Sequence, residues 1–112
     1  MSQQLAPAPI GIDIGTYKSK IAVAKRGGVE VITNEANFRE TPCIVGFGKE
    51  ERQIGESGNI KMKSNFKDTI VSPMRFLGLE ANYPLLRAET KFTPAKTLTT
   101  DEKIKFDIHY QG

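Results

Sequence analysis

The fold is decided by residues 10–16, which read IGIDIGT. Apolar β-branched side chains alternate here with small or polar ones, which predicts a buried strand that ends before Gly15. A tight turn built on glycine lets backbone N–H groups converge on an anion with no Cβ in the way. Asp13, at the end of the strand, can hold a hydrated Mg²⁺ beside phosphates, and Thr16 can donate its hydroxyl to a phosphate oxygen. A plain hairpin that uses glycine and aspartate only to form its turn explains the same residues, so the motif alone leaves both interpretations open.

Two further strands follow this turn. Residues 19–24 form a second apolar run, the pair Gly27-Gly28 suits a turn with positive φ, and residues 29–33 form a third run. The first 34 residues therefore predict a three-stranded antiparallel meander. Residues 1–9 are polar and rich in proline and alanine, which predicts a disordered leader, and they lack the basic and apolar parts of a secretory signal.

The remainder of the chain predicts a mixture of short strands and helices. Ser72 and Pro73 are typical of a helix start, as N-cap and first-turn residue, and Gly78 is typical of a helix end. Asn82 is the expected cap of a later helix. The expected elements are strands at 43–47 and 53–55, a helix at 56–64, a short helix from 72 to 78, a helix at 82–90, and strands at 91–98 and 104–110. These elements hold fewer apolar residues than the meander, which favours a fragment that completes a larger fold.

Composition excludes several classes of protein. The 112 residues are 38% hydrophobic and 26% charged, which is typical of a globular chain, and no apolar run approaches the roughly 18 residues of a membrane span. The net charge of +3 is small and both signs are interleaved, so neither a nucleic acid nor a membrane is an expected partner. A single cysteine, Cys43, excludes an intrachain disulfide and favours a reducing, cytoplasmic location. It starts an apolar strand and is expected to be a buried structural thiol.

Residues 11–16 resemble the opening loop of the actin, hexokinase and heat-shock ATPase superfamily, and further blocks extend the likeness over residues 10 to 112. Those blocks are similar to the seventy-kilodalton heat-shock chaperones: residues 31–35, 39–42, 45–48, 54–56 and 75–78. The resemblance implies an α/β fold, the N-terminal fragment of an actin-like (ribonuclease H-like) ATPase domain with an antiparallel β-meander and a small α+β subdomain. Residues 10–38 would begin the first lobe with its phosphate loop, and residues 39–112 would form the neighbouring subdomain.

The branch of the family is indicated by residues 22–30 and 32–35, and by residues 45–48 with Glu51 and Arg52, which are similar to the large hundred-and-ten-kilodalton chaperones. This resemblance implies a stress-response chaperone that binds ATP or ADP with Mg²⁺, acts as nucleotide exchange factor for an ordinary seventy-kilodalton partner, and holds unfolded polypeptides through regions outside this chain. Two alternatives remain: an active chaperone ATPase of the ordinary branch, and an interaction scaffold that binds no nucleotide.

The resemblance also implies the site residues. The cofactor-binding set is Asp13, Gly15, Thr16, Tyr17 and Lys18, with Asp13 holding the metal through water. Met74 stands where the family carries a lysine that reaches the γ-phosphate, and a thioether can neither donate a hydrogen bond nor supply positive charge. Losing one preorganised donor costs on the order of a hundredfold or more in rate, so weak or absent hydrolysis is expected and no catalytic residue is assigned. Lys18 is the candidate replacement, and an ion-pairing role is favoured for Arg75 over a role in the cleft.

Overall fold

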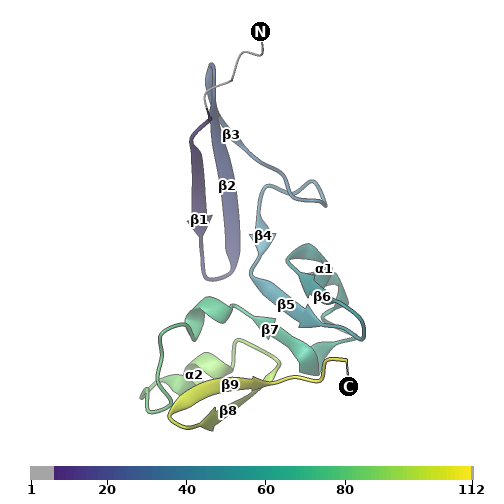
Figure 1. Cartoon of the computed structure of the whole chain (residues 1–112), viewed down its shortest axis with the longest axis vertical. Coiled ribbons are helices and arrows are strands. Elements are labelled where there is room, and N and C mark those ends of the chain that lie inside the picture. Colours follow the sequence, from purple (N-terminus) through teal and green to yellow (C-terminus); the bar gives the residue numbers. More distant parts are fainter. Residues whose placement is uncertain (1–6, 112) are drawn as a thin grey trace.

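The computed structural model describes residues 7–111, which form three small antiparallel sheets and several short helices (Figure 1). The elements in chain order are β1 (Ile10–Ile14), β2 (Lys18–Lys25), β3 (Gly28–Val31), β4 (Thr41–Pro42), β5 (Ile44–Phe47), β6 (Arg52–Ile54), α1 (Glu56–Lys61), the 3₁₀ turn η1 (Phe66–Asp68), β7 (Thr69–Val71), the 3₁₀ turn η2 (Pro73–Arg75), α2 (Leu86–Thr90), β8 (Lys96–Thr100) and β9 (Lys103–Asp107). None of these helices has the length and apolar character needed to cross a membrane.

The first sheet confirms the predicted meander. Strands β1, β2 and β3 are antiparallel neighbours, and the short strand β4 pairs with the start of β2. The third strand ends at Val31, two residues earlier than expected. The leader expected over residues 1–9 lies mostly outside the described residues, but the carbonyl of Pro9 accepts a hydrogen bond from the amide of Ala24 (3.0 Å). The last residue of that leader is therefore tied to β2.

The expectation of a buried first strand is wrong for this chain. All five residues of β1 are exposed, and Ile12 leaves 63% of its surface open. Alternation shows which side chains share a face of a strand, but burial of that face needs a second layer of structure. No element of residues 7–111 packs over either face of β1.

The second sheet holds the best-packed part of the chain. Strand β5 lies between β6 and β7, and helix α1 packs on β5 and β6. Gly58 allows that packing, because a Cβ there would lie 2.8 Å from the carbonyl oxygen of Gln53. Ile44, Phe76 and Ala95 are buried, as are the polar residues Thr69, Ser72 and Thr93.

Strands β8 and β9 form a hairpin joined to this core. Phe106 of β9 packs edge-on against Phe76, with 5.1 Å between the ring centroids. The turn residues Asp101 and Glu102 both have positive φ (52° and 62°), the conformation that suits the twist of a two-residue hairpin. Before β8, the Thr93 hydroxyl accepts a hydrogen bond from the amide of Val71 (2.8 Å) and so links the two sheets.

Several local predictions are corrected. Ser72 does not cap a helix: it is left-handed (φ 53°) and buried without a side-chain cap bond, and only a 3₁₀ turn follows it. Asn82 is not a cap either, because α2 begins at Leu86 after Leu85. The helix expected at 56–64 ends at Lys61, the short strand expected at 53–55 spans 52–54, and the closing strands span 96–100 and 103–107. Strands β4 and β7 were not predicted, since they are two and three residues long and exist only through pairing with β2 and β5.

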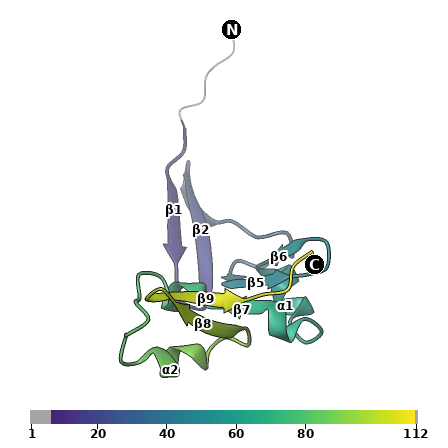
Figure 2. The same ribbon diagram turned by 60° about the horizontal axis from the view of Figure 1, so that its bottom comes forward.

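The arrangement places one end of the first hairpin against the rest of the chain. In Figure 1 the hairpin of β1 and β2 extends along the long axis of the molecule, and its turn points toward the segment that carries η2 and α2. Figure 2 shows the same relation from another direction, with β8, β9 and α2 grouped together below the turn. The predicted phosphate loop therefore lies where the two parts of the chain meet.

Candidate functional site

The candidate site is the turn between β1 and β2. The amide of Gly15 donates to the carbonyl of Lys18 (3.1 Å), which closes the turn. A Cβ on Gly15 would lie only 2.5 Å from that carbonyl oxygen, a distance that real Cβ atoms do not show. Glycine is therefore required here by the close approach of the two strands.

The next two amides at the tip of the turn are not used in the same way. Within residues 7–111, the N–H groups of Thr16 and Tyr17 have no backbone or side-chain acceptor. Both residues are exposed. The turn therefore presents two adjacent donors to solvent, while the Gly15 amide, which the motif also suggested as an anion donor, is already bonded within the turn.

Asp13 lies on β1, with Lys20 of β2 as its register partner. It is exposed and forms no ion pair with any described residue. Its carboxylate is therefore available to a hydrated cation near the turn.

Cys43 forms hydrogen bonds to the backbone of the turn. Its amide donates to the carbonyl of Tyr17 (2.8 Å), and its thiol donates to the carbonyl of Gly15 (3.3 Å). The hydroxyl of Ser19 lies 3.3 Å from the same sulfur. The thiol is half-buried rather than fully buried, and its contacts are structural.

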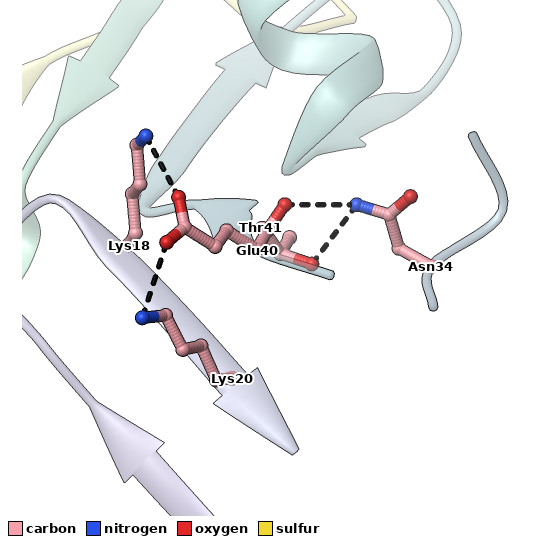
Figure 3. A network of polar contacts seen from close by, with 5 residues as sticks. All are labelled: Lys18, Lys20, Asn34, Glu40 and Thr41. Carbon is pink, nitrogen blue, oxygen red and sulfur yellow. Dashed lines mark hydrogen bonds and ion pairs between the residues drawn. The ribbon is translucent and has the colours of Figure 1, made fainter. Parts of the chain in front are cut away.

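Lys18 forms an ion pair across the strands. Its Nζ lies 2.8 Å from Oε2 of Glu40, and Nζ of Lys20 lies 3.1 Å from Oε1 of the same carboxylate (Figure 3). Asn34 holds the neighbouring backbone, since its side-chain amide donates to the Glu40 carbonyl (3.2 Å) and to the Thr41 hydroxyl (3.1 Å). Two lysines thus share one carboxylate, and Lys18 is not a free amine.

These contacts shift the pKa values of two side chains. The hydrogen bond from Lys18, followed by that from Lys20, lowers the pKa of the Glu40 carboxyl below its ordinary value. The hydrogen bond to Glu40 raises the pKa of Lys18. The side chains are 41 to 59% exposed, so water and salt weaken the attraction between them.

Arg75 reaches the turn from the other part of the chain. Its Nη2 donates to the hydroxyl of Tyr17 (2.9 Å), and its Nη1 lies 3.1 Å from Oε2 of Glu89. The favoured ion-pairing role of Arg75 is therefore confirmed. Met74 precedes it in η2 and is 42% exposed, so the residue at the expected lysine position lies next to one that contacts the turn.

Of the predicted set, the structure brings together Gly15, Thr16, Tyr17 and Lys18 at one end of the hairpin, with Asp13 on the adjoining strand. Sequence reasoning missed Glu40, which lies 22 positions from Lys18, because no spacing rule relates residues on strands whose pairing is unknown. Only the register that sets Ser19 opposite Thr41 shows that the two charges meet.

Comparison with known proteins places these observations in a family. A family model described as Hsp70 protein matches residues 9–112. The chain is 38% identical over 95 residues to a heat shock protein homolog of Saccharomyces cerevisiae, and the match covers 85% of this chain and 14% of that protein. It is 37% identical over 105 residues to a heat shock protein homolog of Lachancea kluyveri, and this match covers 93% of this chain and 15% of that protein.

A third organism gives a similar match. "Heat shock protein 88" of Dictyostelium discoideum is 36% identical over 104 residues, which cover 92% of this chain and 14% of that protein. The chain therefore spans only about one seventh of the length of the curated relatives it matches.

Proposed function

The chain belongs to the Hsp70 protein family, with relatives in its large branch, and from this premise we propose that it supplies the first phosphate-binding turn of an ATP-binding chaperone. Its fold is that of a fragment of the Hsp70 nucleotide-binding domain, an actin-like α/β fold with antiparallel sheets. We assign residues 10–38 to the start of the first lobe and residues 39–112 to its neighbouring subdomain.

One observation carries the proposal: the tip of the β1–β2 turn presents the amides of Thr16 and Tyr17 without an acceptor among the described residues. Adjacent N–H groups in a glycine turn form a concave donor set that suits a phosphate group. Lys18 and Lys20 lie beside the turn and share the carboxylate of Glu40, while Asp13 lies opposite Lys20, so the side-chain charges here are mixed and the backbone amides carry the proposal.

The residues present also fit Mg²⁺ as a companion of the phosphates. The Asp13 carboxylate is exposed and unpaired within residues 7–111, and a hydrated Mg²⁺ uses one or two carboxylates together with phosphate oxygens. When bound, the metal would neutralise charge on the phosphates, and Asp13 would hold it through a water molecule.

We propose that the full-length protein hydrolyses ATP weakly or not at all. Met74 supplies no donor, and Lys18, the candidate replacement, is held by Glu40 at 2.8 Å. An amine in that ion pair would have to leave its partner before it could reach a phosphate.

The wider role follows from the family and its large branch. We propose that the full-length protein acts in the cytoplasm as an exchange factor for an ordinary seventy-kilodalton chaperone and as a holdase for unfolded polypeptides. The open apolar side chains of β1, such as Ile12 and Ile14, support a larger domain that covers this sheet.

The test measures ATP binding and single-turnover hydrolysis by the full-length protein. We expect binding with little hydrolysis, a rise of about a hundredfold in rate for Met74→Lys, and loss of binding for Gly15→Ala. A normal basal rate in the unmutated protein would support the active-ATPase alternative instead. No detectable binding of ATP or ADP would support the scaffold alternative.

A further inference from the structure

The guanidinium of Arg75 lies against two aromatic rings. Its Cζ is 3.7 Å from the ring centroid of Phe92 and 5.2 Å from that of Tyr17. A planar, weakly hydrated cation stacks well on aromatic faces, and it can donate hydrogen bonds from its edge at the same time. Those edge bonds go to Tyr17 and to Glu89.

The group is mostly withdrawn from water. The side chain of Arg75 is 18% exposed and that of Glu89 is 22% exposed. The Nε atom of Arg75 is buried and has no hydrogen-bond partner among the described residues. The orientation of the guanidinium is therefore set by Tyr17, Glu89 and Phe92, and rotation of the group would break several contacts at once.

This contact joins two parts of the chain that are far apart in sequence. Tyr17 lies in the β1–β2 turn and Arg75 lies 58 positions later in η2. Of the side-chain hydrogen bonds described within residues 7–111, it is the one that links the first hairpin to residues 65–111. Tyr17, whose hydroxyl accepts this hydrogen bond, also carries one of the two backbone amides without an acceptor.

We propose that Arg75 is a positioning residue for the phosphate-binding turn. Clamped between Phe92 and Glu89, it fixes the side chain of Tyr17 and so directs the amides of Thr16 and Tyr17 toward the ligand. This inference rests on the proposed function for its effect on nucleotide, but the effect on the turn itself does not need nucleotide.

A double-mutant cycle on the full-length protein tests it. Arg75→Lys keeps the charge and loses the planar fork, while Tyr17→Phe keeps the ring and loses the hydroxyl. We expect each change to weaken ADP binding by about fivefold, and the double variant to be no weaker than the weaker single variant, because the two residues act through one contact. Arg87→Lys is the matched control, since Arg87 is exposed on α2 and forms no ion pair within residues 7–111, and its affinity should be unchanged.

A second measurement separates this inference from the proposed function. Without nucleotide, hydrogen exchange of the Gly15 and Cys43 amides, which are bonded to the carbonyls of Lys18 and Tyr17, should be faster in Arg75→Lys, while exchange in β8 and β9 stays unchanged. If the unmutated protein binds no ADP, the proposed function fails and the exchange result alone decides the role of Arg75. Additive losses in the cycle, or unchanged exchange at the turn, would overturn the inference. If Arg75→Lys does not fold, Tyr17→Phe carries the same exchange test with Arg75 left in place.

Discussion

The ammonium of Lys18 and the carboxylate of Glu40 lie 2.8 Å apart, at the point where β2 pairs with β4. Lys18 begins β2 directly after the turn that presents its amides to solvent, so a carboxylate of the chain already pairs with this lysine. The consequences of this relationship can be measured.

Glu40→Gln should strengthen ATP binding. Removing the carboxylate leaves two lysines without a partner near the turn and raises the local charge by one. We expect about a twofold to fivefold gain in affinity at low ionic strength, with the gain shrinking as salt is added. Calorimetric titration at several salt concentrations measures it. Glu35→Gln, an exposed acid without an ion pair in the described part of the chain, is the control.

The same pair predicts a pH dependence of stability. The pKa of Glu40 is lowered in the folded state, so its contribution is present above the ordinary glutamate value and is lost as pH falls through the lowered pKa. The pKa of Lys18 is raised, so its contribution is present below the ordinary lysine value and is lost as pH rises through the raised pKa.

Urea unfolding of the unmutated protein and of Glu40→Gln from pH 2 to pH 7 measures the acidic limb. The difference in unfolding free energy should be small, because the groups are exposed, and should vanish at the acidic end. A difference that grows as pH falls would contradict the ion pair.

Gly58→Ala should destabilise the fold, although alanine is ordinarily the better helix former by about 1 kcal/mol. The new Cβ would lie 2.8 Å from the carbonyl oxygen of Gln53 and 3.1 Å from Cγ2 of Ile44, so α1 would have to move away from the sheet. We expect a loss of about 1–3 kcal/mol by urea unfolding. Asn59→Ala, at the next and exposed position of α1, should be neutral or slightly stabilising, and a gain in both variants would refute the close packing.

Thr93→Val should leave the Val71 amide without its acceptor. That bond is 2.8 Å long and Thr93 is 7% exposed, so water cannot replace it easily. An unpaired buried donor costs about 1–3 kcal/mol, to be measured as a lower unfolding free energy. Thr93→Ser keeps the hydroxyl and should lose less. If Thr93→Val loses no more stability than Thr93→Ser, the hydrogen bond is not what Thr93 contributes here, since valine keeps the methyl group and lacks only the hydroxyl.

Part of the site could be predicted from sequence because its residues are neighbours along the chain. Residues 10–31 alternate and turn within short distances, so the meander and the position of Gly15 at its turn followed from local patterns. The helix starts expected at Ser72 and Asn82 were wrong because capping residues are also common in turns. Here the backbone N–H of Ser72 instead donates a hydrogen bond to the Cys43 carbonyl (2.8 Å).

The sequence by itself determined the order of the first three strands and the glycine turn between two of them, since both depend on contacts between residues a few positions apart. Only the tertiary structure decided that Glu40 holds Lys18, that Arg75 holds Tyr17, and that β7 exists beside β5. Each of these depends on segments separated by more than 20 residues, and their meeting is selected by the packing of the whole chain rather than by any local preference.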